Sequence, residues 1–152
     1  MKDDKRESRI NTTTDVESVW DYPRPPALEE CDSRIRVEFG DIVIVDTHAA
    51  KRVLETSHPP TYYVPLADVV DDVLIASERR SFCEFKGTAH YFNVVVGEKT
   101  AKDAAWYYPH PSARFEALRD HVDFYAHLMD ACLVDSDLVT PQLGRFYGGW
   151  VT

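Results

Sequence analysis

The stretch Cys83-Glu84-Phe85-Lys86-Gly87 continues directly into Thr-Ala-His-Tyr-Phe-Asn-Val-Val-Val at residues 88–96. A thiol, a carboxylate, an amine and a glycine fall within five residues, and a run rich in β-branched and aromatic side chains follows them. This order predicts a turn that leads into a strand. Shorter runs of the same kind recur on both sides, so we predict a sheet built around residues 88–96.

An alternating segment precedes the central stretch. Residues 34–39 alternate between charged and apolar side chains, which predicts a half-buried strand. Gly40-Asp41 predicts a turn, and the apolar residues 42–45 predict a more fully buried returning strand, so the two runs form a hairpin.

The remaining runs are short and are separated by prolines and glycines. Residues 49–54 fit either a helical turn capped by Thr47 or a strand. We predict further strands at residues 61–65, 104–108, 121–128 and 131–134, a helical turn at 115–118 and a solvated loop at 78–81. Nine prolines and six glycines punctuate these runs. The pattern predicts a mainly β, compact single domain, a sandwich or barrel of short strands with few short helical turns.

Composition limits the class of protein. The chain has 152 residues and a formal net charge of −9, which disfavours nucleic acid as a partner. The three cysteines lack CxxC spacing, which fits a reducing cytoplasm. No apolar run has membrane-spanning length, and the first residues lack the apolar core of a signal peptide. We therefore expect a cytoplasmic protein that does not contact membranes.

The N-terminal segment divides into two parts. Residues 1–17 are charged and rich in Ser and Thr, which predicts a mobile arm before a single domain at residues 18–152. Trp20 and Tyr22 stand among prolines, so this part is expected to be an extended strap over a sheet edge. An alternative is that Arg24 clamps an anion over a pocket.

Six separated motifs together resemble one family, domain of unknown function family 427. The resemblance spans nearly the whole chain after the arm, and it implies a compact β-fold of the Mss4-like, or β-tent, group without an established activity. The motifs are Trp20-x-Tyr22-Pro23-Arg24-Pro25-Pro26, Val53-Leu54-Glu55-Thr56-Ser57-His58-Pro59-Pro60, Tyr62-Tyr63-Val64-Pro65, Cys83-x-x-Lys86-Gly87, Ala105-Trp106-x-Tyr108-Pro109 and Phe146-Tyr147-Gly148-Gly149-Trp150.

The family's nucleotidyltransferase-like label has no support in these residues. The chain has neither a Gly-rich phosphate loop nor a Gly-Ser turn followed by paired metal-binding aspartates. Asp71 and Asp72 are adjacent, and adjacent side chains on a strand point apart. Relatives of the implied fold often hold zinc with two CxxC pairs, but three lone cysteines cannot supply four thiolates. No metal and no cofactor is therefore indicated.

Cys83 is the sharpest candidate for chemistry. A nearby cation makes a thiol nucleophilic, and Lys86 is close in sequence. In a turn the amine could approach the sulfur, whereas in a straight strand the two side chains would face opposite ways. The alternative is a buried and inert cysteine.

Lys86 and Glu55 have two interpretations. They form a buried ion pair in the core, or they line a cavity walled by Tyr63, Trp106 and Tyr108. Aromatic walls with a few charged groups are typical of small-ligand pockets.

Three functional hypotheses follow. The leading one is a domain that binds a small organic ligand, with an anionic ligand as one option, through Arg24, Glu55, Tyr63, Lys86, Trp106 and Tyr108. The second is a cysteine-dependent enzyme with Cys83, Lys86 and Glu55 as candidate catalytic residues. The third is a homo-oligomerisation or scaffold module, whose tail would expose Phe146, Tyr147 and Trp150 in the monomer.

Overall fold

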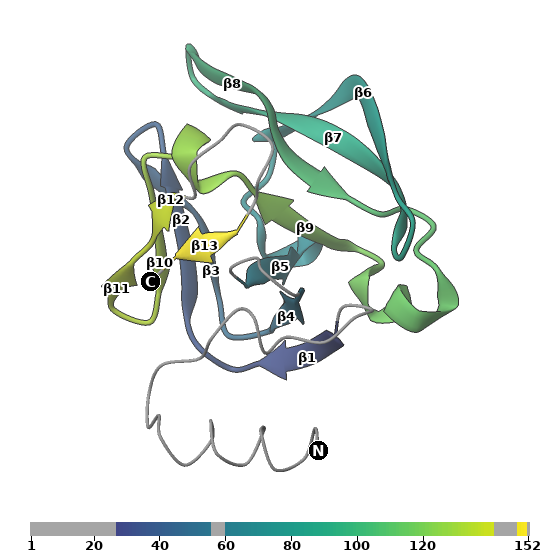
Figure 1. Ribbon diagram of the computed structural model, residues 1–152. Coiled ribbons are helices and arrows are strands. Elements are labelled where there is room, and N and C mark those ends of the chain that lie inside the picture. The colour runs from purple at the N-terminus through teal and green to yellow at the C-terminus, as the bar shows by residue number, and fades with distance from the viewer. Residues whose placement is uncertain (1–26, 56–59, 142–148, 152) are drawn as a thin grey trace.

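The computed structural model describes residues 27–55, 60–141 and 149–151, which are almost wholly antiparallel strands joined by turns (Figure 1). Three short 3-10 segments are η2 (Leu66–Asp68), η3 (Ala113–Leu118) and η4 (Ala126–Leu128). The strands are β1 (Ala27–Cys31), β2 (Ile35–Phe39), β3 (Ile42–Thr47), β4 (Ala50–Leu54), β5 (Thr61–Pro65), β6 (Leu74–Cys83), β7 (Gly87–Val96), β8 (Lys99–Tyr107), β9 (His121–Phe124), β10 (Ala131–Val134), β11 (Asp137–Leu138), β12 (Thr140–Pro141) and β13 (Trp150–Val151).

The strands form two main sheets. The larger has seven strands in the order β1-β4-β5-β9-β8-β7-β6, and the smaller has four in the order β11-β10-β2-β3. A two-stranded ribbon pairs β12 with β13. The mainly β prediction is confirmed, and in the described part of the chain the sheets are open and form no closed barrel. Membership of the β-tent group stays a prediction.

The β2–β3 hairpin follows from its sequence. Ile35, Val37 and Phe39 are at most 2% exposed, as the alternating pattern predicts. Gly40 and Asp41 have φ angles of 63° and 65°, and positive φ at both central residues is the hairpin turn whose twist matches that of the flanking strands.

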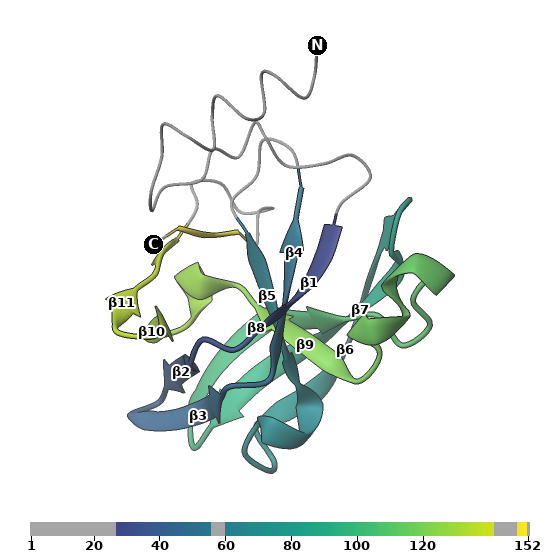
Figure 2. The same ribbon diagram turned by 90° about the horizontal axis from the view of Figure 1, so that it is seen from below.

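The main core lies between the two sheets, which Figure 2 shows from below. The smaller sheet contributes alternate apolar residues of β2 and two adjacent ones of β3, and the larger sheet contributes alternate residues of β5 and β9. Burying this aliphatic and aromatic area is the main stabilising term of the fold. Its members from these strands are Ile35, Val37, Phe39, Ile44, Val45, Tyr62, Val64, Val122 and Phe124.

Strand β3 corrects one prediction. Ile44 and Val45 are buried, but Ile42 and Val43 are 44% and 42% exposed, so the start of this strand is not fully buried. The reason is its position at the edge of the four-stranded sheet, with a register irregularity at Val37 in the partner strand. An edge strand is covered from fewer directions than a central one.

The predicted loop at residues 78–81 is wrong, because these residues lie within β6. β6 is an edge strand of the larger sheet, and charged side chains on an edge protect it from pairing with other chains. Residues 49–54 adopt the strand alternative as β4. The strand predicted to reach residue 128 ends at Phe124, and η4 follows.

The C-terminal tryptophan is part of the core. Trp150 is 1% exposed, and its indole Nε1 donates a hydrogen bond to the carbonyl oxygen of Phe124 at 3.0 Å. Exposure of Trp150 in the monomer, which the oligomerisation hypothesis requires, is therefore wrong. Phe146, Tyr147, Arg24 and the arm at residues 1–17 lie outside the described residues.

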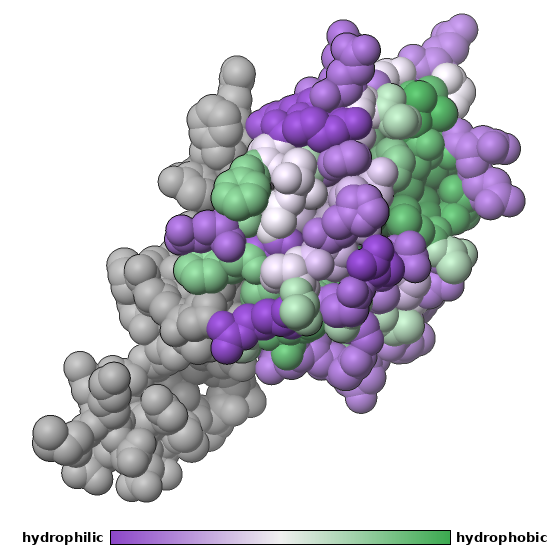
Figure 3. Space-filling view, turned by 90° about the vertical axis from the view of Figure 1, so that its right-hand side faces the viewer, coloured by the Kyte–Doolittle hydropathy of each residue, from purple (hydrophilic) through white to green (hydrophobic). Residues whose placement is uncertain are grey.

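The surface around the β6–β7 hairpin and η3 is mostly hydrophilic, with an apolar area towards one edge of that view (Figure 3). Within the described residues no helix is long and apolar enough to cross a membrane, since the longest, η3, has six residues.

Candidate functional site

The two faces of the seven-stranded sheet differ in chemistry, as strand β9 illustrates. Side chains alternate along a strand. Val122 and Phe124 therefore point into the core between the sheets, and Asp123 points to the opposite side. We call these the inner face and the outer face. The buried apolar residues of the outer-face cluster are Val53, Tyr63, Ala89, Tyr91, Trp106, Tyr108, Phe115, Leu118 and Tyr125.

A row of outer-face residues crosses five neighbouring strands in register. Lys51 of β4 lies opposite Tyr63 of β5, and the β5–β9 register extends this row to Asp123. Asp123 lies opposite Trp106 of β8, and Trp106 lies opposite Tyr91 of β7. Directly opposed side chains on one face are close neighbours. The register therefore places the Asp123 carboxyl group between the strands that carry the rings of Tyr63 and Trp106.

Tyr63 and Trp106 flank Asp123 from both sides, and their side chains meet. The indole Nε1 of Trp106 donates a hydrogen bond to the Tyr63 hydroxyl at 3.3 Å, with ring centroids 6.4 Å apart edge to face. The ring centroid of Tyr108 is 6.3 Å from that of Tyr63. Burial raises the pKa of the Tyr63 and Tyr108 phenols, which therefore keep their protons at neutral pH.

The turn between β6 and β7 carries the charged part of the site. Cys83 ends β6 and pairs in register with Gly87, which begins β7 with a φ of 116°. A Cβ at Gly87 would lie 3.2 Å from the carbonyl oxygen of His110, so glycine is required here. The Ser112 backbone N–H donates to the carbonyl oxygen of Lys86 at 3.0 Å, and the Ser112 hydroxyl donates to that of Phe85 at 2.6 Å.

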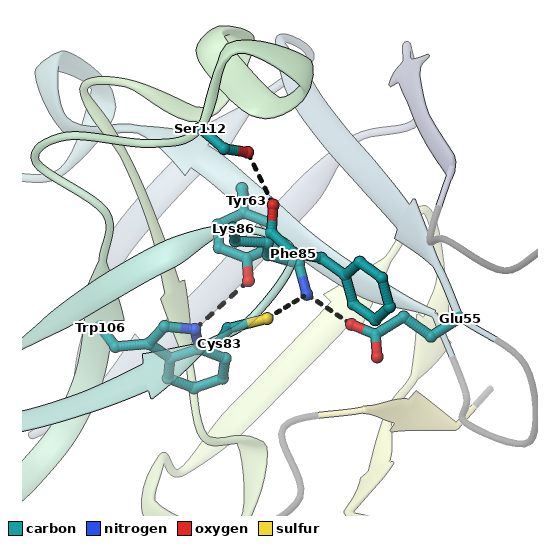
Figure 4. Close-up of polar contacts among 7 residues, drawn as sticks. All are labelled: Glu55, Tyr63, Cys83, Phe85, Lys86, Trp106 and Ser112. Carbon is teal, nitrogen blue, oxygen red and sulfur yellow. Dashed lines mark hydrogen bonds and ion pairs between the residues drawn. The ribbon is translucent and has the colours of Figure 1, made fainter.

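This pinned turn directs the Lys86 side chain inward (Figure 4). Lys86 is 4% exposed, and its Nζ lies 2.5 Å from Oε1 of Glu55. The same nitrogen lies 3.9 Å from Sγ of Cys83 and 5.8 Å from the ring centroid of Phe115. Because Cys83 to Gly87 forms a turn, the amine approaches the thiol as the turn alternative predicts.

Burial makes the Lys86 amine dependent on its partners. Removing an ammonium group from water is costly unless an opposite charge and hydrogen bonds compensate it. Glu55 supplies the charge, and its own side chain is 34% exposed. The amine thus lies inside the protein while its counter-ion reaches the solvent, an arrangement in which the counter-ion can be exchanged.

Asp123 is the most unusual group of the site. It is 0% exposed, and neither carboxylate oxygen accepts a hydrogen bond of normal geometry in the described part of the chain, although the Phe124 backbone N–H lies close enough to lower its pKa. Burial raises its pKa well above the ordinary value, and the Phe124 backbone N–H and the Lys86 ammonium oppose this rise only in part. The uncharged carboxylic acid is therefore favoured, because desolvation penalises the charged form.

The structure brings together five of the six residues expected to bind a ligand. Glu55 and Lys86 form the ion pair, and Tyr63, Trp106 and Tyr108 are buried rings of the outer face. The Glu55 charge acts on the phenols of both Tyr63 and Tyr108, so the ion pair and the rings share one region. The sixth residue, Arg24, lies outside the described residues.

Sequence reasoning missed Asp123. The alternation in residues 121–128 drew attention to the apolar positions, which form the inner face. The signal lay in the intervening positions, Asp123 and Tyr125, because a carboxylate between Val122 and Phe124 must face the other side of a sheet that is buried on both sides.

The three cysteines differ in their exposure to solvent. All three are free thiols; Cys132 is buried, and Cys31 and Cys83 are partly exposed. Burial raises the pKa of the Cys132 thiol. Among the described residues, no group of three or more His, Cys, Asp or Glu side chains could hold a metal ion.

A model of a known protein family matches most of the chain. The family model described as "Domain of unknown function (DUF427)" matches residues 27–135, which include all of the larger sheet, all but β11 of the smaller one, and the outer-face site. The resemblance drawn from the six motifs is therefore confirmed. No curated protein matches the chain.

Proposed function

The chain belongs to domain of unknown function family 427, whose description names no activity, and we propose that it is a small-molecule-binding domain with the Lys86 amine as its central polar group. One observation carries this proposal. A 4% exposed lysine is set against the aromatic outer face, and its counter-ion Glu55 is partly open to water. Binding sites for small molecules have this composition, with mostly aromatic walls and few, well-placed polar groups.

The amine suggests what the ligand presents. An ammonium group is a hydrogen-bond donor only, so the ligand brings an acceptor oxygen, from a carboxylate or a carbonyl group. An anionic ligand can replace Glu55, because the exchange keeps one negative charge beside the buried ammonium. Glu55 can then turn to solvent, since its side chain is already 34% exposed.

A matched pair of lysines tests the proposal. Nζ of Lys99 also lies 2.5 Å from a carboxylate, that of Asp130, and 4.7 Å from the ring centroid of Phe39, but its side chain is 50% exposed. Lys86→Met removes the proposed ligand contact, and Lys99→Met removes an equivalent ion pair on the surface.

The measurement is a thermal-shift screen against nucleotides, flavins, sugar phosphates and organic acids. A ligand at 100 times its Kd stabilises the folded state by about 2.7 kcal/mol, which raises Tm measurably. We expect at least one class to raise the Tm of the wild type and of Lys99→Met and to leave Lys86→Met unchanged. Equal shifts in both variants, or no shift with any class, would contradict the proposal.

The Cys83 thiol supports a second candidate function, a cysteine-dependent enzyme. Its sulfur lies 3.9 Å from the Lys86 amine, and a cation beside a partly exposed thiol is the usual setting of a reactive cysteine. We expect iodoacetamide at neutral pH to alkylate Cys83 much faster than Cys31. Cys132 should react last, because its thiol is buried and its pKa is raised. Labelling of Cys83 at the same rate as Cys31, or more slowly, removes this candidate.

A further inference from the structure

The carboxyl group of Asp123 is fully buried on the outer face of the seven-stranded sheet, opposite Trp106. Both of its oxygens are buried without a hydrogen-bond partner in the described residues. Such a group destabilises the folded state, and few buried polar groups of native proteins are left in this condition. An apolar residue at this position would remove the penalty. A bound molecule would supply the partner that the described residues lack.

The surroundings of Asp123 limit what that partner can be. The Lys86 ammonium is close enough to lower its pKa, and the described residues offer no set of ligands for a metal ion. A cation is disfavoured by the nearby ammonium, and Glu55, the carboxylate beside that ammonium, is already paired with it. Because Glu55 already balances Lys86, the partner of Asp123 is an uncharged polar group.

We propose that Asp123 is a ligand-binding residue whose carboxyl group pairs with the amide edge of a planar cyclic ligand, an edge in which an N–H lies beside a carbonyl oxygen. This inference rests on the proposed function, because it concerns the same site and names the class of ligand. Cyclic amides, imides and oxo-pyrimidines have such an edge.

The pairing follows from the chemistry of a neutral carboxylic acid. The acid has one O–H donor and one carbonyl acceptor side by side, and an amide edge presents the complementary acceptor and donor. Both bonds can then form at once, in a site from which water is excluded. Burial favours this neutral form of Asp123, because desolvation penalises the charged carboxylate.

The neighbours of Asp123 suit a flat ring. Tyr63 and Trp106 lie on the strands at either side, and a 3.3 Å hydrogen bond joins their side chains. A bond of this length is at the weak end of the normal range, so a ligand can displace it. Figure 4 shows this bond in the same region as the Lys86 amine. Aromatic rings stack well on planar heterocycles, and the Lys86 amine can donate a hydrogen bond to a further oxygen of the ligand.

Uracil and 1,3-dimethyluracil form a matched pair of probes. Both are planar and carry the same two carbonyl groups, but only uracil has N–H donors. The readout is the indole N–H signal of Trp106 in two-dimensional NMR, assigned with Trp106→Phe. We expect uracil to shift this signal with a millimolar Kd, and dimethyluracil to bind at least about tenfold more weakly, the loss expected for one buried hydrogen bond.

Three variants separate the roles of charge, shape and pairing. Asp123→Asn keeps a donor and an acceptor of the same size, so it should bind uracil at every pH, whereas the wild type should lose binding as the acid ionises. Asp123→Leu cannot pair and should lose the preference for uracil over dimethyluracil. Asp130→Asn removes one surface carboxylate of the same type and should behave like the wild type.

The outcomes are distinct. Equal affinity of the wild type for both probes, or no response to uracil at its solubility limit, overturns the role of Asp123. An unchanged preference for uracil in Asp123→Leu overturns it as well. If that variant fails to fold, the comparison of the two probes on wild type and Asp123→Asn decides. Ligands that still stabilise the wild type through Lys86 would leave the proposed function standing in each case.

Discussion

The two faces of the seven-stranded sheet use burial differently. The inner face buries aliphatic and aromatic side chains such as Val122 and Phe124 against the smaller sheet. The outer face buries almost as completely, but among its rings lie an ammonium group at Lys86 and a carboxyl group at Asp123 for which the described residues offer no hydrogen-bond partner. The inner face therefore stabilises the fold, and the outer face adds ionisable groups whose burial is costly.

Because of this difference, neighbouring positions of a single strand have different roles, one in stability and the other in the proposed site. Val122 and Asp123 are neighbours in β9, yet one contributes apolar burial and the other an unsatisfied polar group. Natural proteins keep such costly groups at functional sites and compensate elsewhere. Substitutions on the inner face should lower stability, and those on the outer face should change the response to ligands and pH.

The largest expected effect is on the inner face. Phe124→Ala should lower the free energy of unfolding by about 3–5 kcal/mol, since it removes a fully buried ring and leaves a cavity. Urea denaturation followed by fluorescence measures it. A loss below about 1 kcal/mol would show that the inner face is not the main core.

Next comes the ion pair of the outer face. Glu55→Gln should lower the free energy of unfolding by about 1–2 kcal/mol, because it leaves the buried ammonium without a counter-charge. Lys86→Met should change it by less than about 1 kcal/mol, since Glu55 can turn to water. The same denaturation series measures both, and the opposite order of the two effects would contradict a desolvated amine.

The pH dependence of stability tests Asp123. Burial raises its pKa in the folded protein above the ordinary 3.8, so the unfolded chain releases this proton at lower pH. Stability from this group is complete below the unfolded pKa and is lost as the pH rises towards the folded pKa. Relative to Asp123→Asn, the wild type should lose up to about 1.4 kcal/mol per pH unit in that range.

The groups around Asp123 leave this comparison interpretable. The phenols of Tyr63 and Tyr125 and the thiol of Cys132 lie near it, and burial raises the pKa of all three, so they stay protonated in acid. Parallel pH profiles for wild type and Asp123→Asn would show that the carboxyl group is not held neutral by burial.

The smallest effect concerns the Tyr63–Trp106 hydrogen bond. Tyr63→Phe should lower the free energy of unfolding by about 0.5–1 kcal/mol, because the 3.3 Å bond is long and both rings stay packed. The Trp106 indole N–H should then exchange faster with solvent. A cost of several kcal/mol would mean that this hydrogen bond supports the fold and that a ligand cannot easily displace it.

Local patterns were sufficient for much of the fold. The alternation at residues 34–39 and the Gly40-Asp41 turn gave the β2–β3 hairpin, since each depends only on neighbours in sequence. The strand at residues 78–81 could not be predicted in this way. Its charged side chains are typical of a loop, and only its place at the sheet edge explains them.

The site was predictable in part for the same reason. The approach of Lys86 to Cys83 is set by a five-residue turn and was open to sequence reasoning. Its pairing with Glu55 joins residues 31 positions apart and was one of two alternatives. Asp123 could not be singled out, because its burial depends on the register of β5, β9 and β8, which brings Tyr63 and Trp106 to its two sides.

The most direct test of the outer-face site is a high-resolution crystal structure of the protein soaked with small cyclic amides and organic acids. We predict density for an organic molecule within hydrogen-bond distance of Lys86 Nζ or the Asp123 carboxyl group, with the Tyr63–Trp106 bond displaced. Ligands bound only elsewhere, with that bond intact and both groups unchanged, would contradict the account.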